Sequence, residues 1–135
     1  ALGYAEGRGQ PTTVLLGDLS LLHDLNGLSA LRSSEAALTI VVQNNGGGSI
    51  FSRLPIATYD VFSPWFDTPH DLTFEGAARQ FGLPYTRATS IEAFTTAYAD
   101  ACGSNEPALI EVASGLEANA RHHERIENAI REALA

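Results

Sequence analysis

Short aliphatic runs alternate along the chain with stretches whose apolar residues recur at helical spacing. Four runs have the composition and length of buried strands: residues 12–16, 38–42, 85–88 and 108–112. Strands that alternate with helices are typical of a parallel sheet with crossover helices. The pattern therefore predicts an α/β fold with an open, mainly parallel sheet and helices on both of its faces.

Cap residues predict where the helices begin. Ser20 is expected to cap a helix that runs through the leucines at positions 21, 25, 28 and 31. Thr73 and Ser90 are expected to cap two further helices, which end near positions 81 and 102. Residues 116–134 form an amphipathic stretch that predicts a last helix.

Polar residues and glycines follow the first two predicted strands. The first strand ends in Gly17-Asp18, and the second ends in Asn44-Asn45 followed by glycines at 46–48. Because the carboxyl ends of adjacent parallel strands meet at one edge of a sheet, Asp18 and Asn45 should share a crevice of the kind that binds ligands. Carboxylate, carboxamide and backbone carbonyl oxygens suit a magnesium ion that also holds phosphate oxygens. The first turn of the helix at Ser20 would direct backbone N–H groups at the same place, although an Asp after a strand often serves only as a cap or loop residue.

This arrangement resembles the thiamine-diphosphate motif, in which Gly-Asp is followed some two dozen or more residues later by Asn-Asn. Here the step from Asp18 to Asn45 is 45 − 18 = 27 residues. Many members of that family have glycine after the aspartate, whereas this chain has Leu19. The surrounding segments 17–28, 44–55 and 68–72 resemble the 2-succinyl-5-enolpyruvyl-6-hydroxy-3-cyclohexene-1-carboxylate synthase family of menaquinone biosynthesis.

The resemblance implies thiamine diphosphate and Mg²⁺, with Mn²⁺ as a possible substitute, as cofactors. Carried onto this sequence, the metal ligands would be the Asp18 carboxylate, the Asn45 side-chain oxygen and the Gly47 carbonyl. Asn44 would shape the turn, although an exchange of roles between the two asparagines stays open. The full set of implied cofactor-binding residues is Gly17, Asp18, Leu19, Ser20, Asn45, Gly47, Ile50, Phe51 and Leu54. The last three are apolar, so an ordinary core position is their alternative interpretation.

The resemblance also implies a reaction, which decarboxylates 2-oxoglutarate and adds the product to isochorismate. No residue of this chain is assigned as catalytic, because the activating glutamate of such enzymes lies in another domain, on a partner subunit. A homodimer or homotetramer is therefore expected. Two alternatives stay open: another thiamine-diphosphate enzyme, such as an acetolactate-synthase-like or 2-oxo-acid decarboxylase subunit, and a non-catalytic phosphate-binding α/β module.

Composition narrows the classes of partner. The 135 residues include 16 acidic and 8 basic ones, for a net charge of −8, and no basic cluster appears. Nucleic acid and anionic membranes are therefore not expected as partners, because their binding depends on Lys and Arg. The sequence contains neither a signal peptide nor an apolar run long enough for a membrane span, and a cytoplasmic location is expected. The chain begins as if in mid-helix, which predicts a fragment. The resemblance implies the same, because members of that family are several times longer, and it identifies residues 1–135 as a single C-terminal cofactor-binding domain that is truncated on its N-terminal side.

Several residues of chemical interest have plainer interpretations. His70 is interpreted as a packed loop histidine, and His122-His123 as part of a solvated helix face, because adjacent helix residues point in different directions. Arg53 could meet a substrate carboxylate, but a lone arginine is more often solvated. The aromatic, proline-broken stretch 55–69 is long for a loop without regular structure, and such loops are usually functional.

Overall fold

The computed structural model describes residues 1–134, with the side chains at positions 49, 53 and 116–120 left out of the description. Its centre is a four-stranded sheet of β1 (Thr12–Gly17), β2 (Leu38–Asn44), β3 (Tyr85–Ala88) and β4 (Ala108–Ala113). The strand order is β1-β2-β4-β3, and all three neighbouring pairs are parallel. All four predicted strands are confirmed, and β1, β2 and β4 extend one or two residues beyond their predicted ends.

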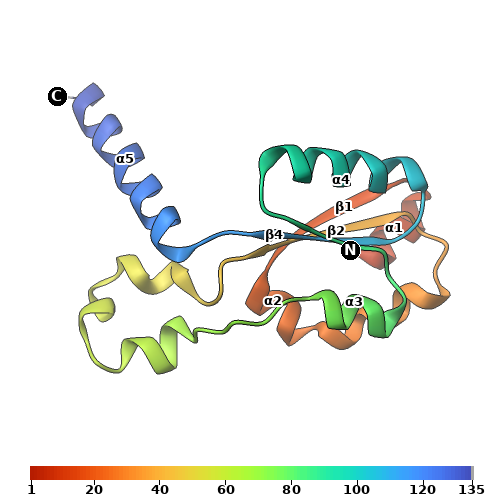
Figure 1. Ribbon diagram of the computed structural model, residues 1–135, viewed down its shortest axis with the longest axis horizontal. Helices are drawn as coiled ribbons and strands as arrows, with labels where there is room; N and C mark the ends of the chain where they lie inside the picture. Colours follow the sequence, from red (N-terminus) through yellow and green to blue (C-terminus); the bar gives the residue numbers. More distant parts are fainter. Residues whose placement is uncertain (135) are drawn as a thin grey trace.

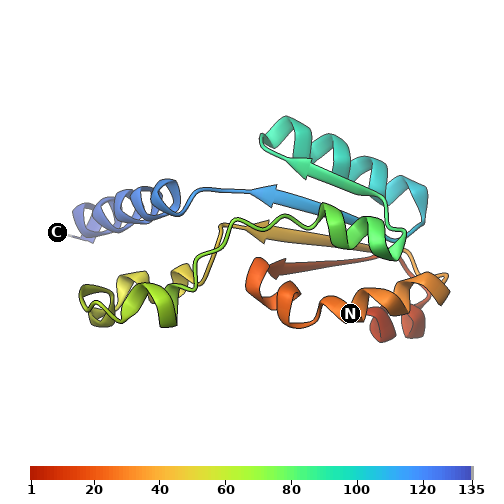
Figure 2. The same cartoon turned by 60° about the horizontal axis from the view of Figure 1, so that its bottom comes forward.

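Helices cover both faces of the sheet, as predicted (Figures 1 and 2). Helix α4 (Ile91–Ser104) lies on one face, and α1 (Leu2–Arg8), α2 (Asp18–His23) and α3 (Glu75–Phe81) lie on the other. The central strands are covered from both sides, so that Val42 in β2 and Leu109 in β4 are completely buried. This layering explains why β2 and β4 are nearly continuous aliphatic runs.

The helix predicted to start at Ser20 is the main local error. Helix α2 starts at Asp18 with Gly17 as its N-cap, so Ser20 lies inside its first turn, and the helix ends at His23. A 3₁₀ helix, η1 (Leu25–Ser33), follows it. Leu25, Leu28 and Leu31 are spaced by three residues, which is the period of a 3₁₀ helix. The same leucines therefore face the core, where Leu28 and Leu31 are buried, but in a tighter helix than the one predicted.

The two other predicted caps have opposite outcomes. Ser90 caps α4 as expected, since its hydroxyl accepts a hydrogen bond from the Ala93 N–H at 3.2 Å. Thr73 does not cap α3: Phe74 is the N-cap residue, and no side chain caps this end. The Phe74 N–H donates instead to the buried Glu111 carboxylate at 2.8 Å.

Beyond the carboxyl ends of the strands lie an aromatic segment and the last helix, α5 (Leu116–Leu134), which projects away from the sheet (Figures 1 and 2). The aromatic segment consists of short helical turns, η2 (Ser49–Arg53), η3 (Pro55–Thr58) and η4 (Ser63–Asp67). Within it the Phe62 and Phe66 rings stack at 6.4 Å, and Phe51 meets Phe66 edge-on at 6.0 Å. In the described part of the chain, 1–134, no helix is both long and apolar enough to cross a membrane.

Candidate functional site

The Asp18 carboxylate joins the ends of β1 and β2. It lies where β1 passes into α2 and is only 3% exposed. Its Oδ2 accepts three hydrogen bonds from backbone N–H groups of the turn after β2. The donors are Asn45 at 3.2 Å, Gly46 at 2.8 Å and Gly47 at 3.1 Å. Its Oδ1 accepts the Leu19 N–H at 2.7 Å. One carboxylate oxygen thus anchors the turn, and the other sits at the first turn of α2, where helical N–H groups lack partners within the helix.

The turn itself requires glycine at two positions. Gly46 and Gly47 have φ of +80° and +148°, which side chains rarely adopt. A Cβ on Gly47 would lie 2.5 Å from the Asp67 carbonyl oxygen, so the following segment rests directly on the turn. Two backbone hydrogen bonds hold that segment in place: Gly48 N–H to Asp67 O at 2.6 Å and His70 N–H to Gly46 O at 2.9 Å. We call residues 66–70 the strap.

The two asparagines have different positions. The Asn44 side chain points into the protein, where its Nδ2 donates to Leu72 O at 2.8 Å and to Glu111 Oε1 at 3.0 Å. Its Oδ1 accepts the Gly46 N–H at 3.2 Å. Asn45 instead lines the pocket at the strand ends. These contacts support the interpretation of Asn44 as the residue that shapes the turn.

A pocket of about 460 Å³ lies at the carboxyl ends of β1 and β2. It brings together seven of the nine residues predicted to bind the cofactor: Gly17, Asp18, Leu19, Ser20, Asn45, Gly47 and Ile50. Phe51 and Leu54 do not line it; Phe51 packs against Phe66, and both residues keep considerable exposure, 41% and 51%. Their predicted role stays a prediction.

Histidines contribute to the site in ways that the sequence did not predict. The His70 ring is nearly buried, as expected, but its Nε2 lies 3.3 Å from Asp18 Oδ2. Its Nδ1 accepts the Leu72 N–H at 3.3 Å. The Nε2 contact is at ion-pair distance but is not aligned as a hydrogen bond, and Nε2 makes none with the described residues. His123 of α5, interpreted as solvated, lines the pocket; only the position of α5 beyond the strand ends could have indicated this.

Behind the turn lies a buried charged group that was not predicted from the sequence. Glu111, in the middle of β4, is completely buried and accepts hydrogen bonds from Asn44, the Phe74 N–H, the Tyr85 hydroxyl and Arg87 Nε. Burial raises the pKa of this carboxyl group, but the bonds from Phe74, Tyr85 and Asn44 and the Arg87 charge outweigh it, so the pKa lies below its ordinary 4.5. Burial, and then the bond to Glu111, raise the pKa of Tyr85. A glutamate inside an apolar run was the available signal, because buried charges need partners.

The donor set fits a magnesium diphosphate. The pocket offers a carboxylate (Asp18), a carboxamide (Asn45) and the backbone of Gly47, which are the hard oxygen donors that Mg²⁺ prefers. Among the described residues no three His, Cys, Asp or Glu side chains form a metal cage. A site with so few protein ligands suits Mg²⁺, which is usually held by one or two carboxylates together with substrate phosphates.

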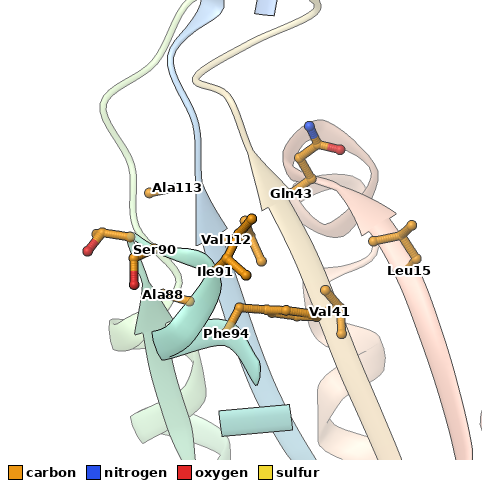
Figure 3. A pocket seen from close by; sticks show the side chains of 10 residues that line it. Leu15, Val41, Gln43, Ala88, Ser90, Ile91, Phe94, Val112 and Ala113 are labelled. Atoms are coloured by element: carbon orange, nitrogen blue, oxygen red, sulfur yellow. The ribbon is translucent and has the colours of Figure 1, made fainter. Parts of the chain in front are cut away.

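A second hollow, on the α4 face of the sheet, has a different character (Figure 3). It has a volume of about 410 Å³, and none of its lining side chains is charged. Leu15 of β1 and Ile91 of α4 are 70% and 80% exposed at its rim. Its apolar lining makes it unsuited to a diphosphate, so the pocket at Asp18 is the candidate site.

Comparison with known proteins agrees with this geometry. The family model for the thiamine pyrophosphate enzyme, C-terminal TPP binding domain, matches residues 1–112; thiamine pyrophosphate is another name for thiamine diphosphate. A 2-succinyl-5-enolpyruvyl-6-hydroxy-3-cyclohexene-1-carboxylate synthase of Salinibacter ruber is 48% identical over 134 residues, 99% of this chain and 22% of that protein. The synthase of the same name from Chlorobium phaeobacteroides is 45% identical over 97% of this chain and 23% of its own length. The resemblance inferred from the motifs is thereby confirmed.

Solved structures share the fold. A thiamine diphosphate-dependent 4-hydroxybenzoylformate decarboxylase of Rhodococcus jostii RHA1 superposes with a TM-score of 0.73 at 26% identity, over 85% of this chain and 22% of that one. A benzoylformate decarboxylase of Polynucleobacter necessarius gives 0.72 at 22% identity, over 84% and 21%. The chain spans less than a quarter of the length of each of these relatives. By its sequence and its fold, the chain belongs to the thiamine pyrophosphate enzyme family, whose C-terminal TPP binding domain it contains.

Proposed function

We propose that this chain is the cofactor-holding half of an active site that converts 2-oxoglutarate and isochorismate. In the reaction 2-oxoglutarate loses carbon dioxide, and the remaining four-carbon unit is added to isochorismate, a step of menaquinone biosynthesis. The observation that carries the proposal is the identity of 48% over 99% of the chain to a protein named as this synthase. The clustering of Asp18, Asn45 and Gly47 in one pocket supports it independently.

In this proposal the residues of the pocket bind and orient the cofactor. Asp18, the Asn45 side chain and the Gly47 carbonyl would hold Mg²⁺, and N–H groups of the first turn of α2 would hold diphosphate oxygens. Mn²⁺ could replace Mg²⁺. Ile50, Phe51 and Leu54 would line the apolar part of the cofactor and exclude water from it. When bound, thiamine diphosphate supplies the carbanion chemistry, while the protein supplies orientation and electrostatics.

The proposal extends beyond the residues of this chain. We place the chain as most of the C-terminal domain of a longer cytoplasmic protein, with the activating glutamate on a partner subunit of a homodimer or homotetramer.

A second candidate function has one observation in its favour. The fold is shared with two decarboxylases, which their names assign to benzoylformate and 4-hydroxybenzoylformate. A thiamine-diphosphate enzyme acting on another 2-oxo acid would place the same Asp18 and Asn45 in the same pocket. The sequence identity to these proteins, 22% and 26%, is well below that to the synthases, so the synthase is the preferred function.

The test is a substrate comparison with the full-length protein, thiamine diphosphate and Mg²⁺. Carbon dioxide release is measured with 2-oxoglutarate, pyruvate and benzoylformate, each with and without isochorismate. The proposal expects release from 2-oxoglutarate together with an isochorismate adduct in the product. Release from pyruvate or benzoylformate and none from 2-oxoglutarate would contradict it and favour the second candidate. Asp18→Asn should abolish release, and Asp100→Asn, on the exposed surface of α4, is the matched control.

A further inference from the structure

The Glu111 carboxylate connects its own strand, β4, with three other segments of the chain. Its Oε1 accepts from Asn44 Nδ2 at 3.0 Å and from Arg87 Nε at 3.3 Å. Its Oε2 accepts from the Phe74 N–H and from the Tyr85 hydroxyl, each at 2.8 Å. These donors come from the end of β2, the residue before α3, and β3. The Glu111 side chain has no exposed surface, so bulk water does not compete for its carboxylate oxygens.

Only two hydrogen-bonded residues separate Glu111 from the candidate metal ligand. Asn44, held by Glu111, accepts the Gly46 N–H at its Oδ1 at 3.2 Å. The same Gly46 N–H donates to Asp18 Oδ2 at 2.8 Å. Glu111 therefore fixes the asparagine that sets the conformation of the turn, and the turn in turn fixes the Asp18 carboxylate.

The same carboxylate also secures the chain that follows the strap. The Phe74 N–H donates to Glu111, and the Leu72 carbonyl accepts from the Asn44 amide that Glu111 orients. These two residues follow His70, whose N–H binds Gly46 O. Both sides of the glycine turn, the Asp18 side and the strap side, are thus held from one buried group.

This arrangement needs an ionised carboxylate, because both of its oxygens accept hydrogen bonds and neither donates one. In a glutamine at position 111, whichever atom became the NH₂ group would face two of the present donors, Asn44 and Arg87 or Phe74 and Tyr85. The Tyr85 hydroxyl can turn round to accept, but the Phe74 N–H cannot. Flipping the Asn44 amide instead would set its NH₂ against the Gly46 N–H. Removing the charge therefore breaks a contact on one side of the turn, either at Asn44 or at Phe74 after the strap, whereas an apolar packing role would not require the charge.

We propose that Glu111 is a positioning residue of the cofactor site, which holds the Asn45–Gly48 turn and the strap in the geometry that binds magnesium and diphosphate. It acts through Asn44 and touches neither metal nor cofactor. The inference rests on the proposed binding of thiamine diphosphate with Mg²⁺ at this pocket. Partners that orient metal ligands typically change metal affinity or activity by about 10–100-fold when they are mutated.

The experiment measures thiamine diphosphate binding and the half-saturating Mg²⁺ concentration of the full-length protein by calorimetry. Glu111→Gln should raise both values by about tenfold or more. Tyr85→Phe is the matched control, because it removes one donor to the same carboxylate but leaves the bonds to Asn44 and Phe74; its values should stay near those of the wild type. Thermal unfolding of each cofactor-free variant shows how far stability alone has changed.

A double-mutant cycle separates positioning from general destabilisation. Asn44→Leu keeps the approximate size of the side chain and breaks the link between Glu111 and Gly46, and it should also weaken binding. The two substitutions should be non-additive, so that Glu111→Gln has little further effect when Asn44 is already changed. If Glu111→Gln does not fold, Asn44→Leu alone decides: weakened binding supports the inference, and unchanged binding overturns it.

The results distinguish a failure of the proposed function from a failure of the inference about Glu111. Wild-type binding of the cofactor without any dependence on Mg²⁺, or no binding at all, would overturn the proposed function and the inference with it. Normal Mg²⁺-dependent binding by wild type and by folded Glu111→Gln alike would overturn the inference and leave the proposed function intact. Equal losses in Glu111→Gln and Tyr85→Phe would also overturn it, because the effect would then not pass through Asn44.

Discussion

Replacing Gly47 by alanine tests whether the strap and the turn are as closely packed as their geometry indicates. The new Cβ would lie 2.5 Å from Asp67 O, 3.2 Å from Thr68 O and 3.3 Å from Pro69 Cα, all backbone atoms that cannot rotate away. Such overpacking typically costs about 1–3 kcal/mol. The φ of +148° adds a further cost of roughly 1–3 kcal/mol for a residue with a side chain. We therefore expect a loss of about 2–6 kcal/mol in the free energy of unfolding, the sum of these two terms.

Gly82→Ala is the matched control for this measurement. Gly82 also has a positive φ, +70°, but a Cβ there would meet nothing within 4 Å. It should show only the conformational cost of about 1–2 kcal/mol. Denaturant unfolding of the full-length protein gives both values, and calorimetry gives the affinity for thiamine diphosphate with Mg²⁺. The reasoning would be refuted if Gly47→Ala were no less stable than Gly82→Ala and bound the cofactor equally well.

Three further substitutions test separate parts of the structure. Ser90→Ala removes the cap of α4 and should lower the free energy of unfolding by about 1 kcal/mol without changing cofactor affinity, measured by denaturant unfolding and calorimetry. Gly76→Ala should raise the free energy of unfolding by up to about 1 kcal/mol in the same assay, because Gly76 lies in the exposed part of α3 and a Cβ there meets nothing within 4 Å. A loss of stability would contradict the assignment of this residue to an α-helix. Because the Glu111 pKa in the folded protein lies below 4.5, its stabilisation is complete above that value and is lost as the pH falls from it through the lowered pKa. Acid unfolding should therefore show a weaker pH dependence in Glu111→Gln than in wild type, and identical curves would count against the lowered pKa.

The strands and their polar ends could be predicted because their signals are local. An aliphatic run that is buried on both faces contains few polar residues, and the polar residue after it marks the edge of the sheet. Asp18 and Asn45 were therefore assigned to one crevice from the chain alone, and both line the pocket. The tight turn at Gly46 and Gly47 could be predicted in the same way, because the positive φ angles of both residues favour glycine.

What the sequence did not predict depends on contacts between distant residues. The donors to Glu111 lie 24 to 67 positions away from it, and nothing local to the Ile110-Glu111-Val112 run indicates which side chains they are. The approach of His70 to Asp18 depends in the same way on the strap lying across the turn. The predicted helix type at Leu25–Ser33 was wrong for a different reason. Apolar positions three residues apart suit both an α-helix and a 3₁₀ helix, and the α-helix is the commoner of the two.

Calorimetry of thiamine diphosphate binding to the full-length protein, with and without Mg²⁺ and beside Asp18→Ala, tests the central claim most directly. Asp18 supplies the only carboxylate among the described residues that line the pocket, and the same carboxylate anchors the turn that carries Asn45 and Gly47. The account predicts that wild-type binding requires Mg²⁺ and is lost in Asp18→Ala. Binding that is indifferent both to Mg²⁺ and to this substitution would contradict it.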